Sequence, residues 1–157
     1  MMLSPGDSVQ DFSARSDDGT PIQLSAYAGQ PVLLFFFPNV TSTHCQMQAR
    51  RYQTLEGEFA KIGVQLLGVS VDSRSVQSSF RELCKLSFPL ISDGDHRLSE
   101  QFGVLTQTDD GQTGKNIMIH ARRTTFLIDA QGKVARRWDD VNPNTNAAEV
   151  LAELQAS

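Results

Sequence analysis

Apolar and polar residues follow one another along this chain in patterns that predict an alternation of strands and helices. Residues 32–37 and 64–71 are nearly unbroken apolar runs, typical of strands that are buried on both faces of a sheet. Between these runs, apolar side chains recur at the spacing of a helix, and Gly63 follows the last of them as a stop signal. The predicted buried stripe of that helix consists of Tyr52, Leu55, Phe59 and Ile62.

The same patterns predict the remaining elements. Two turn signals are present: an Asp-Gly pair at residues 18–19, between the first two predicted strands, and residues 129–132, between the last two. Residues 106–116 are predicted to form a polar loop. The predicted strands cover residues 12–15, 22–24, 32–37, 64–71, 88–91, 124–128 and 134–138. Three predicted helices cover residues 45–62, 98–102 and 146–155. A fourth is predicted to begin at a cap formed by Asp72 or Ser73 and to end at about Lys85, with Val76, Phe80 and Leu83 on one face.

This order of elements indicates an α/β fold. Strands that alternate with helices form a mostly parallel sheet with helices on both faces, and the hairpin near the C-terminus adds an antiparallel edge. In such sheets, ligands bind outside the carboxyl ends of the strands. Cys45 follows the carboxyl end of the strand at 32–37, so its placement is that of a site.

Composition narrows the class of protein. The 157 residues are expected to form one domain spanning 1–157, with 39% hydrophobic and 20% charged residues. A net charge of −4 argues against a nucleic-acid partner, which requires a basic face. We see neither a secretory signal nor an apolar stretch long enough to cross a membrane, and therefore expect a cytoplasmic protein whose two cysteines are not joined in a permanent bridge.

Cys45 has two interpretations from position alone. A thiolate is the reactive form of cysteine, and the first turn of a helix favours an anion through its unpaired N–H groups and its dipole. A nearby arginine would add a permanent positive charge. The alternative is a half-buried small residue without a chemical role.

A set of segments in one order resembles a known family. Residues 38–45 read Pro-Asn-Val-Thr-Ser-Thr-His-Cys, close to the pattern Pro-x-x-x-Thr-x-x-Cys with Ser42 in place of threonine. Residues 68–73, 88–93 and 123–129 resemble further segments of the same family. From Pro5 to the C-terminus the chain is similar to the peroxiredoxins of the bacterioferritin comigratory protein (PrxQ) group, in the AhpC/TSA-type thioredoxin-fold family. This resemblance implies a thioredoxin-like fold.

The resemblance also implies roles for individual residues. Cys45 would be the peroxidatic nucleophile, Pro38 would shield its thiolate from water, and Ser42 would donate a hydrogen bond to the peroxide. Arg123 would stabilise the thiolate and the charge that develops on the peroxide oxygens. Gln48 matches a position where the family carries Glu or Gln beside the substrate. Arg122 is the neighbouring alternative to Arg123, but only Arg123 keeps the family spacing to the strand that follows.

The chain departs from the family pattern in two places. The family has Pro-Gly directly before the cysteine, where this chain has Thr43-His44. Many members have a resolving cysteine five residues after the first, a position that is Arg50 here. Cys84 is then the candidate resolving cysteine, in a helix that is rich in serine and lacks a glycine cap. The alternative for Cys84 is a buried core residue.

We therefore expect a thiol peroxidase that reduces hydrogen peroxide and organic hydroperoxides and is recycled by thioredoxin or another thiol. No cofactor and no metal site are expected, because the histidines have no ligand spacing with the cysteines. A monomer or weak dimer is expected, with no membrane partner. The alternatives are a one-cysteine peroxidase that uses an external thiol, and a non-catalytic or holdase-type protein on the same fold. A general thiol–disulfide oxidoreductase would require a second cysteine at Gln48.

Overall fold

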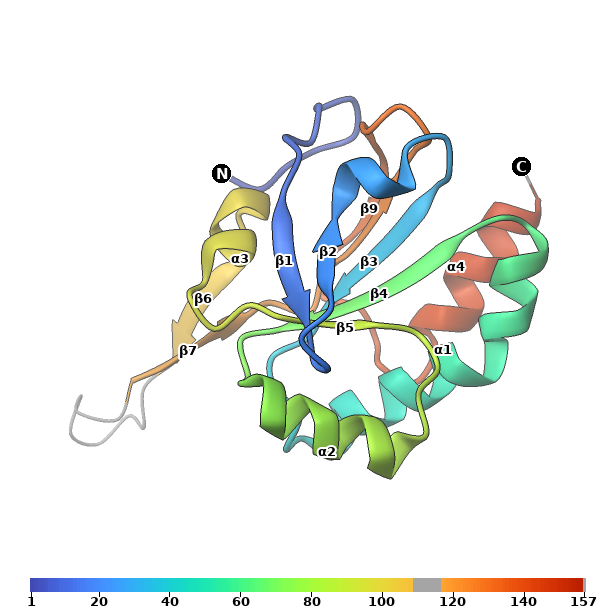
Figure 1. Ribbon diagram of the computed structural model, residues 1–157. Helices are drawn as coiled ribbons and strands as arrows, with labels where there is room; N and C mark the ends of the chain where they lie inside the picture. Colours follow the sequence, from blue (N-terminus) through green and yellow to red (C-terminus); the bar gives the residue numbers. More distant parts are fainter. Residues whose placement is uncertain (109–116, 157) are drawn as a thin grey trace.

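The two long apolar runs lie at the centre of a seven-stranded sheet in the computed structural model, which describes residues 1–108 and 117–156 (Figure 1). The strand order across this sheet is β2-β1-β5-β4-β3-β8-β9. Its strands are β1 (Ser13–Ser16), β2 (Pro21–Gln23), β3 (Val32–Phe36), β4 (Gln65–Ser70), β5 (Leu90–Ser92), β8 (Thr125–Ile128) and β9 (Val134–Trp138).

The centre of the sheet is parallel and its flanks are antiparallel. β3, β4 and β5 pair in parallel, as expected for strands connected through helices. β8 and β9 form the antiparallel hairpin predicted at one edge, and β1 and β2 form an antiparallel pair at the other. β8 also pairs antiparallel with β3, with Phe35 opposite Thr125. The amino end of β8 therefore lies beside the carboxyl end of β3.

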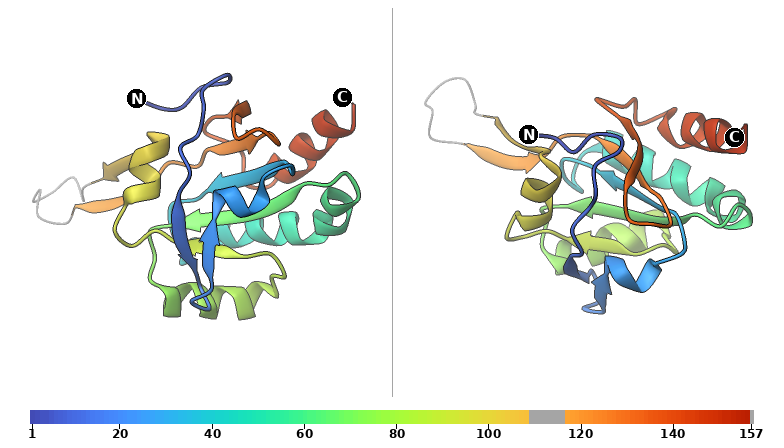
Figure 2. Two further views of the ribbon diagram at one scale, coloured as in Figure 1. Left: turned by 45° about the horizontal axis from the view of Figure 1, so that its top comes forward. Right: turned by 90° about the horizontal axis from the view of Figure 1, so that it is seen from above.

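Helices cover both faces of the sheet. Alternate side chains of β3 enter two separate cores, with Leu33 and Phe35 on one face and Leu34 and Phe36 on the other. The first core is closed by α1 (Thr43–Lys61), α2 (Arg74–Cys84) and α4 (Asn146–Gln155). The second is closed by α3 (Arg97–Phe102), the N-terminal segment and the 3₁₀ helix η1 (Leu24–Tyr27). α3 and α4 consequently lie at opposite sides of the protein (Figure 2).

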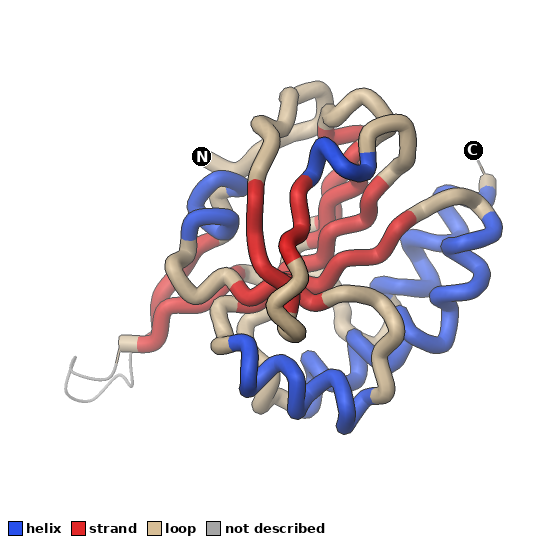
Figure 3. The backbone as a smooth tube through the Cα atoms, viewed as in Figure 1, coloured by secondary structure: helices blue, strands red, loops and turns tan. Residues whose placement is uncertain are grey.

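A second sheet was not predicted. β6 (Leu105–Thr108) and β7 (Met118–Ala121) pair antiparallel and project from the body beside α3 (Figure 3). The prediction of a polar loop over 106–116 is thus wrong for 106–108, and the rest of that range lies outside the described residues. β6 reads Leu-Thr-Gln-Thr and has no apolar face, so its strand structure depends on pairing with β7 rather than on a hydrophobic pattern.

Two predicted helix faces also differ from the structure. Tyr52 and Phe59 of α1 are buried as predicted, but Ile62, the residue directly after the helix, is 38% exposed. In α2, the buried face consists of Gln77, Phe80 and Cys84, whereas Val76 and Leu83 are 42% and 53% exposed. Gln77 can be buried because its Nε2 donates hydrogen bonds to the Ser70 side chain and to the Ile91 carbonyl, at 2.9 and 2.8 Å. Hydrogen bonding to the sheet therefore outweighs the apolar pattern in setting the orientation of α2.

Within the described part of the chain, no helix is both long enough and apolar enough to span a membrane.

Candidate active site

The loop that follows β3 is held by hydrogen bonds to its own backbone. The N–H of Phe37 continues the pairing with β4 at 3.0 Å, and Pro38, which has no N–H, ends it. The side-chain Oδ1 of Asn39 then accepts hydrogen bonds from the N–H groups of Thr41 and Ser42, at 3.1 Å each. Such a turn, built on an asparagine side chain, leads the chain directly into the start of α1.

Cys45 is the third residue of α1. Ser42 is the N-cap, and its Oγ accepts a hydrogen bond from the His44 N–H at 3.2 Å. Thr43 and His44, which replace the family's Pro-Gly, are the first two residues of the helix and both are exposed. Cys45 itself is only 1% exposed. Its position in the first turn places it near N–H groups without helical acceptors and near the positive end of the helix dipole.

Arg123 reaches Cys45 from the neighbouring strand. It stands two residues before β8, whose amino end lies beside the carboxyl end of β3. The half-buried guanidinium donates from Nη2 to Cys45 Sγ at 3.3 Å and from Nη1 to Gln48 Oε1 at 2.6 Å. Gln48 follows Cys45 by three residues, so both acceptors lie on one face of α1. A planar guanidinium with several N–H groups can serve both at once.

Arg122 points elsewhere. Its side chain is 51% exposed and forms an ion pair with Asp140, with 3.5 Å between Nη2 and Oδ1. Adjacent residues of an extended segment project to opposite sides, which explains why the two arginines have different surroundings.

Gln48 connects the site to a buried network that the sequence did not indicate. Its Nε2 donates to Asn146 Oδ1 at 3.1 Å, and that same oxygen accepts hydrogen bonds from Tyr52 and Thr125. All four side chains are at most 1% exposed. Burial raises the pKa of the Tyr52 hydroxyl, which therefore remains a donor. Asn146 was predicted only as the start of α4, because a polar residue at a helix start is usually an exposed cap.

Cys84 is buried at the end of α2. It is the last residue of α2, is 5% exposed, and belongs to the same hydrophobic cluster as Cys45. Both thiols are free. Burial raises the pKa of the Cys84 thiol, and the nearby positive charge of Arg50 acts in the opposite direction. Arg50 also donates from Nη2 to the Leu83 carbonyl at 3.2 Å, which attaches α1 to the end of α2.

The structure thus brings together part of the predicted set. Cys45, Gln48 and Arg123 are in direct hydrogen-bond contact. Ser42 caps the same helix turn, and half-buried Pro38 lies at the end of the preceding strand. Across residues 1–108 and 117–156, no three His, Cys, Asp or Glu side chains are grouped so that they could hold a metal ion.

Known proteins share this arrangement of sequence and fold. The model of the AhpC/TSA family matches residues 5–137. Peroxiredoxin Bcp of Escherichia coli (strain K12) is 37% identical over 159 aligned residues, covering 98% of this chain and 96% of that protein. Peroxiredoxin Bcp of Bacillus subtilis (strain 168) is 31% identical, covering 99% and 97%.

Solved structures agree with the sequence relatives. The bacterioferritin comigratory protein of Xanthomonas campestris has a TM-score of 0.85 at 30% identity, covering 99% of this chain and 97% of that one. A variant of the PrxQ of Xylella fastidiosa has a TM-score of 0.90 at 28% identity, covering 99% and 98%. The predicted thioredoxin-like fold is confirmed. The chain therefore belongs to the AhpC/TSA family, and within it to the peroxiredoxins of the bacterioferritin comigratory protein (PrxQ) group, which are thiol peroxidases.

Proposed function

We propose that Cys45 is the peroxidatic residue of this peroxidase. The contact between Arg123 Nη2 and Cys45 Sγ, at 3.3 Å in the first turn of α1, is the observation that supports this most strongly. The Cys45 thiolate attacks one peroxide oxygen, so that an S–O bond forms and the O–O bond breaks. The departing oxygen takes the electron pair and a proton and leaves as water or an alcohol. Cys45 is left as a sulfenic acid.

Arg123 has two tasks in this proposal. Its fixed positive charge favours the thiolate over the thiol, and its N–H groups stabilise the negative charge that develops as the O–O bond breaks. Gln48 acts as a positioning residue, because its Oε1 accepts from Arg123 while its Nε2 is held by buried Asn146. Gln48 thereby restricts the guanidinium to an orientation that faces the sulfur.

Ser42 and Pro38 complete the proposed substrate site. Ser42 Oγ accepts from the His44 N–H, and a hydroxyl that accepts through a lone pair still has its own proton to donate to a peroxide oxygen. Pro38 is half-buried and presents only carbon atoms and a carbonyl next to the loop. We assign it to excluding water from the thiolate.

Cys84 is the proposed resolving cysteine. Its thiolate attacks the Cys45 sulfur, so that an S–S bond forms, the S–O bond breaks, and the departing hydroxide takes a proton to become water. A disulfide requires Cα atoms within about 7 Å. The two cysteines are held at the start of α1 and the end of α2, and we propose that these helix ends rearrange locally to bring the two sulfur atoms together.

The proposed substrates are hydrogen peroxide and organic hydroperoxides. A related structure, that of the Xanthomonas campestris protein, is described in terms of alkyl peroxide reduction. In this chain, a shallow groove of about 250 Å³ beside the site is lined mainly by apolar Val40, Val76, Phe80 and Leu83, which would suit a hydrocarbon group. We propose thioredoxin or a similar dithiol as reductant, a reducing compartment such as the cytoplasm, and a monomer or weak dimer.

Intact mass measured under non-reducing conditions tests the proposal. Reduced protein is mixed with one equivalent of hydrogen peroxide, and the wild type is compared with Cys45→Ser and Cys84→Ser. The wild type should lose two hydrogens and remain monomeric, and Cys84→Ser should gain oxygen on the peptide that contains Cys45. A Cys45→Ser variant that consumes peroxide at the wild-type rate would exclude Cys45 as the nucleophile.

A further inference from the structure

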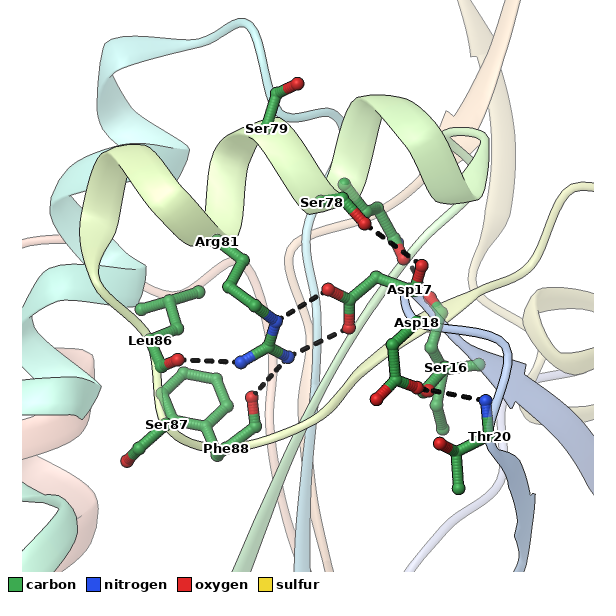
Figure 4. Close-up of polar contacts among 12 residues, drawn as sticks. Ser16, Asp17, Asp18, Thr20, Ser78, Ser79, Arg81, Leu86, Ser87 and Phe88 are labelled. Carbon is green, nitrogen blue, oxygen red and sulfur yellow. Dashed lines mark hydrogen bonds and ion pairs between the residues drawn. The ribbon is translucent and has the colours of Figure 1, made fainter.

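A buried ion pair attaches the end of α2 to the turn between β1 and β2. Arg81 binds both carboxylate oxygens of Asp17 through one edge of its guanidinium, Nε to Oδ2 at 2.6 Å and Nη2 to Oδ1 at 2.8 Å (Figure 4). The Asp17 side chain is 2% exposed and that of Arg81 is 27% exposed. Two parallel, charge-assisted hydrogen bonds make this geometry rigid. Removing one partner would leave a charge without compensation in the interior.

Arg81 also holds the chain that follows the helix. Its Nη1 donates to the Leu86 carbonyl at 2.7 Å and its Nη2 to the Phe88 carbonyl at 2.8 Å. Cys84 lies between Arg81 and Leu86 in the sequence, so it belongs to segment 81–88, whose two ends are connected by the hydrogen bonds of Arg81. These bonds and the Asp17–Arg81 ion pair therefore hold the backbone on both sides of Cys84.

The backbone of this segment is strained where α2 ends. Lys85 has a φ of 54°, the left-handed conformation that glycine adopts readily and lysine does not. The segment thus contains a conformation that favours opening and an ion pair that opposes it. Once the hydrogen bonds of Arg81 to its acceptors are broken, opening of the segment relieves the strain at Lys85.

Cys84, Leu86 and Phe88 of this segment are buried in the first core, and the other polar attachments of segment 81–88 are exposed. Arg50 donates to the Leu83 carbonyl at 3.2 Å, and Gln53 exchanges hydrogen bonds with Ser87, the shortest of which is 2.8 Å. These contacts lie at the exposed surface of α1, where a solvent molecule can take over either partner. The Asp17 carboxylate, by contrast, is only 2% exposed, so water has little access to replace Arg81 as its partner.

We propose that the Asp17–Arg81 ion pair is a latch that keeps segment 81–88 folded and thereby sets how fast Cys84 reaches the Cys45 sulfenic acid. This rests on the proposed resolving role of Cys84. When segment 81–88 opens slowly, the sulfenic acid of Cys45 remains available to a second peroxide molecule. That molecule adds another oxygen to give the sulfinic acid and releases water. Asp17 and Arg81 are then positioning residues that determine the partition between disulfide and over-oxidised enzyme.

Asp17→Asn tests the latch, with Asp18→Asn as the matched control. Asp18 is in the same turn and is exposed, and it accepts hydrogen bonds from Ser16 and Thr20 rather than from Arg81. The fraction of sulfinic acid is measured by intact mass over a range of peroxide concentrations. Asp17→Asn should require at least about fivefold more peroxide for half over-oxidation, because the closed segment opens more often. The rate of sulfenic acid formation should be unchanged, and Asp18→Asn should behave like the wild type.

Ser78→Ala provides a milder second variant. Ser78 Oγ donates to the Asp17 carbonyl at 3.0 Å, so its loss weakens the attachment without leaving a charge unpaired. The same shift, smaller in size, is expected. The proposal is overturned if Asp17→Asn or Ser78→Ala reaches half over-oxidation at the same peroxide concentration as the wild type.

Alkylation of Cys84 in a Cys45→Ser background separates the latch from the resolving role. Faster alkylation on Asp17→Asn, together with a wild-type disulfide between Cys45 and Cys84, supports the proposal. Faster alkylation without any wild-type disulfide means that Cys84 does not resolve, and the proposal falls together with that role. A wild-type disulfide with alkylation unchanged by Asp17→Asn overturns the latch alone.

Discussion

Arg123 and Cys45 are separated by 78 residues in the sequence, yet Arg123 Nη2 lies 3.3 Å from Cys45 Sγ. The antiparallel pairing of β8 with β3 produces this contact, since it sets the amino end of one strand beside the carboxyl end of the other. The pairing of the strands, rather than the flexibility of the arginine side chain, therefore places the positive charge of Arg123 beside Cys45.

Arg123→Lys should slow sulfenic acid formation by about 10²- to 10³-fold, the usual loss when a preorganised donor is removed from a reacting oxygen. Lysine keeps the charge but cannot donate to Cys45 and Gln48 in the planar geometry of a guanidinium. The measurement is the second-order rate constant with hydrogen peroxide, obtained by competition. Arg122→Lys is the matched control and should retain the wild-type rate, because Arg122 pairs with exposed Asp140. Equal losses in the two variants would contradict the assignment.

Ser42→Ala should lower the peroxidase rate by about tenfold or more and should also destabilise the fold by about 1 kcal/mol, because an N-cap is lost together with a substrate donor. Ser42→Thr keeps both the cap and the hydroxyl and should restore both properties. The two effects are measured separately, by peroxide competition and by urea unfolding of the reduced protein. An alanine variant that is less stable but fully active would restrict Ser42 to its capping role.

Asn146→Ala should destabilise the protein by about 2–4 kcal/mol, because three buried donors lose their common acceptor and each unsatisfied group costs about 1–3 kcal/mol. The donors come from Gln48, Tyr52 and Thr125. Asn144→Ala is the control, since the exposed Asn144 side chain accepts one hydrogen bond, from Arg51 at 3.2 Å, among the described residues, and its loss should cost less than about 0.5 kcal/mol. Similar unfolding free energies for the two variants would show that the network contributes little.

The sequence was sufficient where structure depends on neighbouring residues. The apolar run of β3 and the helix that follows it are local patterns, so the position of Cys45 at the start of α1 could be predicted. The start itself is two residues earlier than predicted, because Ser42 rather than a later residue caps the helix. Boundaries of this kind depend on one hydrogen bond and are the least regular feature of a pattern.

The sequence was insufficient where contacts join distant residues. Gln48 and Asn146 are 98 residues apart, and Arg81 and Asp17 are 64 apart. Nothing in the local pattern distinguishes a buried asparagine or aspartate from the exposed ones that the same residue types usually form. The prediction that Val76 and Leu83 face the core was wrong for the same reason. Gln77 is buried instead through hydrogen bonds to β4 and β5, which the local pattern of α2 does not reveal.

The stability of the reduced protein should fall as pH rises through the alkaline range, in part through Cys84. Burial raises the pKa of the Cys84 thiol in the folded state, so the unfolded chain loses this proton first. The stabilisation is fully present below the unfolded value of about 8.5 and is lost as pH rises through the higher folded pKa, with a slope of at most about 1.4 kcal/mol per pH unit for one proton. Urea unfolding at about pH 7.5 and about pH 9.5 under reducing conditions measures this loss.

Cys84→Ser, which has no proton to lose in this range, should lose less stability between the two pH values than the wild type. Arg50→Gln should steepen the wild-type loss, because the charge of Arg50 partly offsets the effect of burial. Parallel losses in wild type and Cys84→Ser would mean that Cys84 is as easily ionised in the folded protein as in the unfolded chain.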